Sequence, residues 1–215
     1  MKNLLLLPVL VLLSISFLTA QSTDDPFFGD MKPRNIGPAG MSGRINTIDV
    51  NLSNPDEILI GSASGGVWKS SNGGTSWTPI FQNEETAAVG ALAIDQNNPN
   101  IIWVGTGEGN PRNSLSGGYG LYKSIDGGRT WKHLGLEKTR HIHRIILHPT
   151  DPNIAWLGVI GSPWGEHSER GVYKTVDGGK TFKKVLFVDN KTGAADLILD
   201  PHNPNKLVAA MWEHR

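Results

Sequence analysis

The 215-residue chain contains no cysteine, which excludes a disulfide scaffold, a thiolate zinc site and a cysteine nucleophile. It also has no excess of either charge, since 20 Lys and Arg residues face 20 Asp and Glu residues. That balance excludes the polybasic surface of a DNA- or RNA-binding protein, so no nucleic-acid partner is expected. Tyrosine is scarce, whereas 26 glycines and 13 prolines are present. This composition is typical neither of a disordered chain nor of a helical bundle, and it favours a β-rich globular protein.

Long hydrophobic runs are absent except at the N-terminus. Residues 4–18 are almost wholly apolar, they follow a short start that contains Lys2, and Thr19-Ala20 come before Gln21. This pattern is typical of a signal peptide over residues 1–20, because fifteen residues are few for a membrane span. An uncleaved N-terminal anchor is the alternative. We therefore expect a secreted, periplasmic or cell-surface protein with no membrane span after signal cleavage.

A ten-residue pattern occurs three times, at residues 68–77, 122–131 and 173–182. It reads aromatic, Lys, Ser/Thr, any residue, Asp/Asn, Gly, Gly, any residue, Thr/Ser, aromatic. An Asn-Pro or Asp-Pro turn precedes each copy, and a fourth such turn begins at Asn203. Two markers that recur in the same order at a period near fifty residues indicate an internal repeat.

Each repeat contains four short apolar runs with Gly and Pro between them, as strand interiors require. Four strands at this period predict an all-β fold, a β-propeller with an incomplete ring of about three and a half blades, with a stacked solenoid as the rival. After a lead segment at 21–43, the expected blades span about 44–81, 88–135, 142–187 and, truncated, 195–215. A break inside a repeat indicates an N-terminal fragment of a longer protein that carries the rest of the propeller, although several copies assembling into a ring would also close it.

The Asp-Gly-Gly turns have a structural explanation. Glycine adopts positive φ at little cost, aspartate binds backbone amides within a turn, and the final aromatic side chain anchors the hairpin in its sheet. We therefore expect structural roles, without metal binding, for the turn and anchor residues Asn72, Trp77, Asp126, Trp131, Asp177 and Phe182.

The second copy, Ser124-x-Asp126-x-Gly128-x-Thr130-Trp131, resembles the Asp-box of BNR repeats at each defining position. The first copy departs from it with Asn72, and the third departs with Phe182. Residues 34–215 resemble the start of large secreted bacterial proteins with sortilin-like BNR-repeat propellers, which are often labelled glycosyl hydrolases. The resemblance implies the propeller fold. Asp-boxes occur in sialidases, xyloglucanase-type hydrolases, sortilin-type receptors and a photosystem II assembly propeller, so it implies no single activity.

In a four-stranded meander the loops between strands two and three share one face. Two of these loops are long here, at about 106–119 and 162–170, and extra loop length on one face of a repeat scaffold usually carries binding. Aligning Ile48, Ile94, Leu147 and Leu199 also places polar residues at the start of the innermost strands. We expect a ligand-binding rim that comprises Arg44, Arg112, Arg140, His141, His143, Trp164 and His167.

The favoured function is that of a secreted or cell-envelope module that binds an extracellular protein or polysaccharide. The alternative is a xyloglucanase- or sialidase-like glycoside hydrolase whose catalytic residues lie partly in other blades. Canonical glycoside hydrolysis needs two carboxyl groups, and only Glu108 and Glu166 are weak candidates. The position that resembles the catalytic aspartate of xyloglucanases holds Asn46, which cannot act as a base. His141 and His143 alternate along a strand, but two ligands make no metal site, so neither metal nor cofactor is expected.

Overall fold

The computed structural model describes residues 44–110 and 112–214. The expected signal peptide at residues 1–20 and the lead segment at 21–43 lie outside this part of the chain. The described residues form strands and one short 3-10 helix, η2 (Glu137–Thr139). No helix within them is long and apolar enough to cross a membrane.

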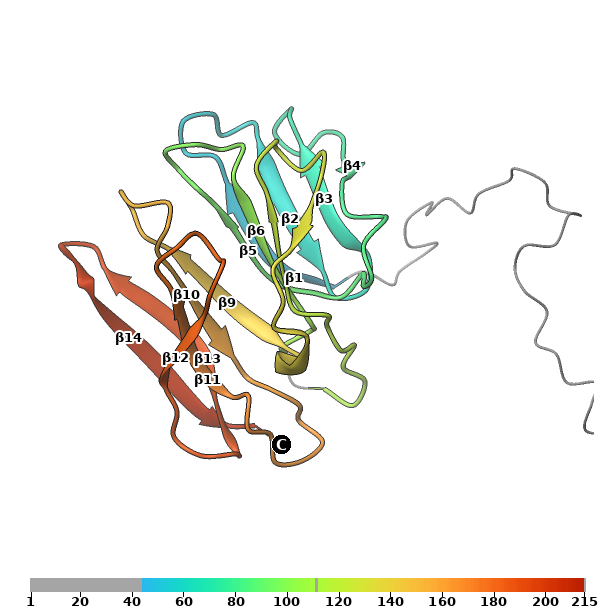
Figure 1. The fold of residues 1–215 in the computed structure, drawn as a ribbon. Coiled ribbons are helices and arrows are strands. Elements are labelled where there is room, and N and C mark those ends of the chain that lie inside the picture. The colour runs from blue at the N-terminus through green and yellow to red at the C-terminus, as the bar shows by residue number, and fades with distance from the viewer. Residues whose placement is uncertain (1–43, 111, 215) are drawn as a thin grey trace, which may run out of the picture. The chain divides into compact units, whose positions relative to one another are not determined.

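Three antiparallel meanders of four strands follow one another along the chain, each paired in sequence order (Figure 1). We call them blades one, two and three. Blade one contains β1 (Ile45–Val50), β2 (Ile58–Ser62), β3 (Gly66–Ser70) and β4 (Thr78–Pro79). Blade two contains β5 (Val89–Ile94), β6 (Ile102–Thr106), β7 (Leu121–Ser124) and β8 (Lys132–His133). Blade three contains β9 (Ile142–Leu147), β10 (Ala155–Val159), β11 (Gly171–Thr175) and β12 (Lys183–Leu186).

The last described sheet has two long strands, β13 (Thr192–Asp200) and β14 (Asn203–Glu213), which we call the half-blade. Its first strand contacts β9, β10 and β11 of blade three, as β5 contacts blade one and β9 contacts blade two. The all-β prediction and the four-stranded repeat are therefore confirmed, and the ring is incomplete.

The hydrophobic core lies between consecutive blades. Leu59 and Phe81 of blade one pack with Val104 and Tyr122 of blade two, and the rings of Phe81 and Tyr122 meet edge to face with centroids 5.1 Å apart. Trp103, 1% exposed, belongs to the cluster shared by blades two and three. Each such buried side chain contributes about 1.5–3 kcal/mol from burial alone, so the packing between blades stabilises the fold.

All four innermost strands carry a register irregularity at the same place. The pairing shifts between Ile45 and Thr47 in β1, and equivalent shifts occur in β5, β9 and β13. The residues at these β-bulges are Asn46, Gly90, His143 and Ala195. A bulge leaves one residue unpaired and reverses the alternation of side chains beyond it.

The observed strand pairing corrects one detail of the sequence alignment. Val50 pairs with Ile58 at the end of β1, as Ile94 pairs with Ile102 at the end of β5. Val50, rather than Ile48, is therefore the equivalent of Ile94. The sequence alignment had made Arg44 the equivalent of His143, but Arg44 lies two residues before the bulge position that His143 occupies.

The Gly-Gly hairpins are held by their own side chains. Ser124 Oγ donates to Asp126 Oδ1 at 2.8 Å, while the Thr130 amide and hydroxyl donate to the two carboxylate oxygens at 2.9 and 2.7 Å. These hydrogen bonds lower the pKa of Asp126 to about 2. The Gly127 amide donates to Asn100 O at 2.9 Å and thereby joins the hairpin to the Asn-Pro turn of its own blade.

The other two hairpins repeat this arrangement with small changes. Asp177 accepts from the amide and hydroxyl of Thr181, and its pKa is likewise lowered by these bonds. In the first hairpin Asn72 accepts from the Ser76 amide and donates to its hydroxyl, each at 2.9 Å. The final aromatic side chains of the second and third hairpins, Trp131 and Phe182, pack between blades, and Trp131 Nε1 donates to Ile80 O of blade one at 2.7 Å.

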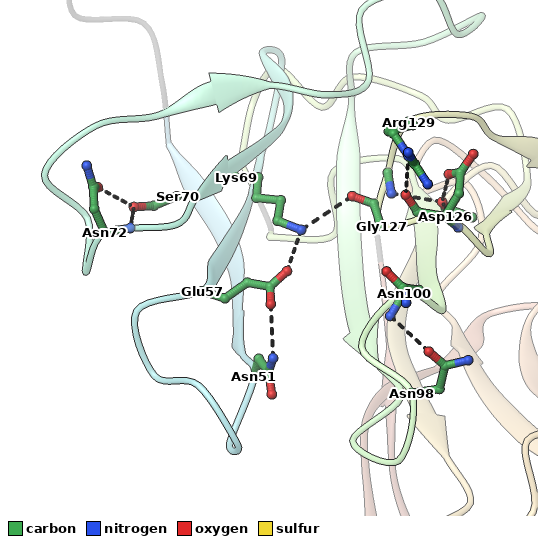
Figure 2. A network of polar contacts seen from close by, with 12 residues as sticks. Asn51, Glu57, Lys69, Ser70, Asn72, Asn98, Asn100, Asp126, Gly127 and Arg129 are labelled. Carbon is green, nitrogen blue, oxygen red and sulfur yellow. Dashed lines mark hydrogen bonds and ion pairs between the residues drawn. The ribbon is translucent and has the colours of Figure 1, made fainter.

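The lysine of the first two repeat motifs links its blade to the next one. Figure 2 shows the ammonium of Lys69 between the carboxylate of Glu57 and the carbonyl of Gly127 in the following hairpin, at 3.5 Å from the latter. Lys123 Nζ likewise donates to Gly178 O at 3.1 Å and lies 4.5 Å from the centroid of the Trp103 ring. Burial lowers the pKa of Lys123. The hairpin face therefore carries the same contact twice.

Candidate ligand-binding rim

The loops between the second and third strands lie at the opposite ends of the strands from the Gly-Gly hairpins. In blade one only residues 63–65 separate β2 from β3, whereas residues 107–120 and 160–170 connect the corresponding strands of blades two and three. The longer loops fold back over the starts of the innermost strands. They form the rim that the sequence predicted to bind a ligand.

The loop of blade two is anchored at both ends by Thr106. Its hydroxyl donates to Gly120 O at 2.6 Å and accepts from the Tyr119 amide at 2.7 Å. Further along, the Gly118 amide donates to Arg140 O of the next blade at 2.7 Å. The loop thus bridges two blades instead of projecting freely.

Glu108 lies beneath this loop rather than at the surface where the sequence placed it. Its side chain is 0% exposed, and Oε1 accepts from Arg44 Nε at 2.8 Å and from Arg44 Nη2 at 2.5 Å. Glu108 Oε2 is buried without a hydrogen-bond partner. An ion pair with one buried carboxylate is costly to break, so Arg44 and Glu108 join blades one and two.

Asn46 and Asn110 continue the junction between these blades. The Asn46 side chain donates to Val89 O at 2.8 Å and accepts from Asn110 Nδ2 at 3.1 Å. Asn46 therefore acts as a connector at the bulge of β1. Both hydrogen bonds of Asn46 are structural contacts between the blades.

The histidines predicted for the rim differ in exposure. His141 is 2% exposed and His143 is partly buried, and the Nδ1 atom of each is buried without a partner. Burial lowers the pKa of His141 to about 4, and it lowers the pKa of His143 and His167 as well. His141 thus lies under the rim as a neutral side chain, and the bulge at His143 removes the simple alternation expected for the pair.

Arg170 organises the loop of blade three. Its side chain is fully buried, and its guanidinium donates to four carbonyl oxygens, those of Ile160, Ser162, Gly165 and His214. The bond to His214 O is 2.9 Å long and ties the loop to the end of the half-blade. Five rigid donors make arginine suited to such a clamp.

The clamp supports a pocket of about 450 Å³ at the rim. It is lined by Pro163, Trp164, Gly165, Glu166, Arg170, Lys191 and His214. Trp164 is 69% exposed, and Lys191 Nζ lies 3.8 Å from Glu166 Oε1. His214 is 3% exposed with Nε2 unpartnered, and burial lowers its pKa. The pocket thus combines an accessible indole, two opposite charges and a neutral imidazole.

The remaining predicted residues do not form one site with this pocket. Arg112 and Arg140 are exposed, and the guanidinium of Arg140 lies against Gly117. His167 is half-buried, with Nδ1 against Gly161. The structure therefore places Arg44 at the junction with Glu108 and Trp164 at the pocket, while His141 lies near enough to Arg140, His167 and His214 for their charges to lower its pKa. Within residues 44–110 and 112–214, no group of three or more His, Asp and Glu side chains is arranged to hold a metal ion.

Two residues of the pocket, Lys191 and His214, lie outside the loops that the sequence predicted to bind, and Arg170 lies within the predicted loop but was not assigned to the rim. Arg170 directly precedes a strand at the end of an inserted loop, which is a detectable signal for a loop clamp. Lys191 and His214 come from both ends of the half-blade, and only the β13–β14 pairing brings them together. Their proximity has no signal in the local sequence.

Several solved structures share this arrangement of blades. An ancestral GH74 enzyme matches with a TM-score of 0.59 and 21% identity over 80% of this chain, and a GH74 xyloglucanase from Xanthomonas campestris matches with 0.57 and 18% over 78%. YCF48 bound to D1 peptide matches with 0.55 and 14% over 85%. The fold is a β-propeller.

The chain spans 22% and 26% of the two GH74 chains and 56% of the YCF48 chain. No protein-family model matches it, and no curated protein matches it. At these identities the similarity concerns the fold alone. A binding module and a glycoside hydrolase are both compatible with it.

Proposed function

We propose that the protein is a propeller module that binds a polar extracellular ligand, a polysaccharide or an extended peptide, at the rim. The observation that carries this proposal is the Trp164 pocket. An exposed indole beside ionic and neutral polar groups suits a ligand that has both apolar faces and hydrogen-bonding groups. The hydrogen bonds of Arg170 hold the loop in place without a ligand, so binding does not lose the conformational entropy of ordering it.

The two carboxyl candidates favour binding over hydrolysis. A general acid must reach the bond that it protonates, but Glu108 is fully buried against Arg44. Glu166 is 63% exposed, and its Oε1 lies 3.8 Å from Lys191 Nζ. The two groups also come from separate parts of the rim, whereas glycoside hydrolysis requires a facing pair.

Two of the similar structures support both ligand classes, since one is a xyloglucanase and the other is a propeller protein bound to a peptide. The location proposed for this protein, outside the cytoplasm, rests on the apolar run and the small residues within 1–20 of the sequence.

Binding can be tested with glycan and peptide arrays probed with the purified chain. Trp164→Ala is expected to weaken the signal at least tenfold, because the indole supplies most of the accessible apolar area of the pocket. Leu52→Ala is the matched control, since Leu52 is also exposed, at 75%, but lies in an Asn-Pro turn. Equal signals for Trp164→Ala and the unaltered chain would remove the pocket from the proposal.

Hydrolysis is tested separately with aryl glycosides and xyloglucan oligosaccharides. The binding proposal expects no turnover by the purified chain. Steady turnover that Glu166→Gln abolishes, with Glu169→Gln as the control, would establish the hydrolase instead.

A further inference from the structure

The junction between blades one and two contains a second pocket, of about 450 Å³, beside the outermost strand β4. One wall comes from β3, β4 and the segment after β4, and the other comes from the Gly-Gly hairpin of blade two. Both walls belong to complete four-stranded blades. We call it the outer pocket, and its polar and aromatic lining includes Lys69, Gln82, Asn83, Glu84, Arg129 and Trp131.

Contacts between the two blades hold the walls of the outer pocket in place. Lys69 donates to Gly127 O across the junction (Figure 2), and Trp131 Nε1 donates to Ile80 O at 2.7 Å. A Cβ added at Gly128 would lie 2.5 Å from Ile80 Cδ1, so the hairpin approaches blade one as closely as a glycine permits. The pocket is therefore formed without a ligand, and binding does not lose the conformational entropy of ordering its walls.

Glu84 places a half-buried carboxyl group in the outer pocket. Among residues 44–110 and 112–214 it has no hydrogen bond and no ion pair. Burial and the neighbouring charge of Glu85 raise the pKa of Glu84. A carboxylate that is partly removed from water without a partner costs free energy, and such a group in a pocket indicates a site for a ligand.

The charges around the outer pocket balance. The Lys69 ammonium pairs with Glu57, which leaves Arg129 and Glu84 as the remaining opposite charges of the lining. Arg129 is exposed, and within the described part of the chain it donates only from Nε, to Asp126 O at 3.0 Å. Its terminal nitrogens are therefore free to donate, while the Glu84 oxygens are free to accept. Donors and acceptors with little net charge suit a neutral ligand that has many hydroxyl groups.

Trp131 adds apolar surface to these polar groups. Because its Nε1 is already bonded to Ile80 O, the ring offers a ligand only apolar contact. An apolar ring beside charged donors and acceptors matches the two sides of a pyranose, which presents C–H groups on one side and hydroxyls at its edge. An extended peptide would need a free strand edge, but β4 has two residues and one of them, Pro79, has no amide hydrogen to donate.

We propose that the outer pocket is a binding site for a neutral saccharide. Glu84 accepts hydrogen bonds from sugar hydroxyls, Arg129 donates to sugar oxygens, and Trp131 contacts the C–H groups of the ring. The site is independent of the Trp164 pocket, because the two pockets share no lining residue.

The outer pocket is specific to this junction. The segment that joins blades one and two, residues 80–88, contains no helix, whereas the corresponding segment after β8 contains η2. The hairpin position of Arg129 holds Lys180 in blade three. The groups that would bind the saccharide are thus not part of the contacts that recur between blades.

The test uses a glycan array of neutral gluco-, galacto-, manno- and xylo-oligosaccharides, probed with the Trp164→Ala variant of the full chain. This background removes the pocket on which the proposed function rests. Saturable binding of at least one oligosaccharide is expected to persist. Glu84→Ala in this background is expected to weaken it about tenfold or more, because hydrogen bonds to a charged group are lost. Glu85→Ala is the matched control, since it removes an adjacent exposed carboxylate outside the pocket.

Two further measurements separate binding from folding. Arg129→Ala is expected to weaken binding a few-fold, and Lys180→Ala, at the same hairpin position of blade three, is expected to leave it unchanged. The melting temperature of Glu84→Ala is expected not to fall, since an unpaired carboxylate that is partly buried does not stabilise the fold.

Three outcomes would overturn the proposal. The first is that the unaltered chain or the Trp164→Ala variant binds no neutral oligosaccharide; binding by the unaltered chain alone would retain the rim and reject the outer pocket. The second is equal binding by Glu84→Ala and Glu85→Ala. The third is binding of peptides, on a parallel peptide array, that Glu84→Ala abolishes, because the occupant would then be a peptide.

Discussion

The two faces of the blades are held together by different kinds of interaction. On the hairpin face, lysine-to-carbonyl bonds and close glycine contacts recur from blade to blade. On the rim, each blade junction is different: blades one and two share a buried ion pair, whereas blade three and the half-blade share the Arg170 clamp. The repeated face uses short contacts to neutral backbone groups, and the rim uses buried charge and long loops.

The difference shows which face is constrained by the ring and which is available for function. A contact that must recur at every junction leaves little room for change, because one altered turn no longer fits its neighbour. The rim contacts occur once each, so each loop can differ from the others. The Trp164 pocket lies on the face where the blades differ.

The first expected effect concerns the glycine contacts of the hairpin face. Gly128→Ala is expected to destabilise the chain by about 2–3 kcal/mol, since φ is +90° and the added Cβ would displace the end of the Ile80 side chain. Gly74→Ala has a similar φ of +87° but an added Cβ that reaches nothing closer than 3.5 Å, so about 1–2 kcal/mol is expected. Urea unfolding measures both values. Equal losses would mean that the blade-to-blade contact contributes nothing.

The next effect concerns the charge pairs. Arg44→Ala is expected to cost about 3 kcal/mol, because it leaves the buried Glu108 carboxylate without its partner. Arg144→Ala is the control, since its ion pair with Asp196 is more than two-fifths exposed on both sides and is worth less than about 1 kcal/mol. Glu108→Gln in the Arg44→Ala background is expected to restore part of the loss. The free energies of unfolding of the three variants separate the cost of leaving a buried carboxylate unpaired from the small gain of an exposed ion pair.

The rim is also expected to lose stability in acid. The pKa of His141 falls from about 6.5 in the unfolded chain to about 4 in the fold, so the unfolded state binds protons first. Its contribution, on the order of 3 kcal/mol, is complete above pH 6.5 and is lost as the pH falls towards 4. The pKa values of His143, His167 and His214 are lowered too and act in the same direction. Melting temperatures between pH 7.5 and 4 measure the effect.

The variant His141→Leu is expected to flatten part of this pH dependence, while His202→Leu, in the exposed turn between β13 and β14, leaves it unchanged. An unaltered slope in His141→Leu would show that the acid sensitivity arises elsewhere.

The smallest expected effect is at the turn aspartates. Asp126→Asn reproduces the arrangement that Asn72 adopts in the first hairpin, where the amide donates to a hydroxyl instead of accepting from it. Its melting temperature is expected to fall less than that of Asp126→Ala, which removes every hydrogen bond to the carboxylate. A fall as large as that of Asp126→Ala would show that the negative charge itself is needed.

Local patterns were sufficient to predict the fold. The Gly-Gly turns, the alternating apolar runs and the period near fifty residues predicted four-stranded blades, because each pattern reflects contacts within one blade. The two long loops were also predictable, since length differences between repeats are visible in the sequence.

The positions of charged residues were not predictable in the same way. Glu108 and His141 look like surface residues in the sequence, yet the loop of blade two covers both. The observed pairing makes Val50, and not Ile48, the equivalent of Ile94, so Arg44 lies two residues away from the position that the sequence alignment gave it. The Trp164 pocket depends on Lys191 and His214, which only the pairing of β13 with β14 brings together.

The shared bulge of the innermost strands also separates two kinds of change. The residues that follow Asn46, Gly90, His143 and Ala195 must keep a regular register with the neighbouring strand. Before the bulge, the extra unpaired residue allows the register of the incoming chain to differ from that of the strand. The connection that enters each innermost strand can therefore change in length from blade to blade without altering the strand pairing that follows the bulge.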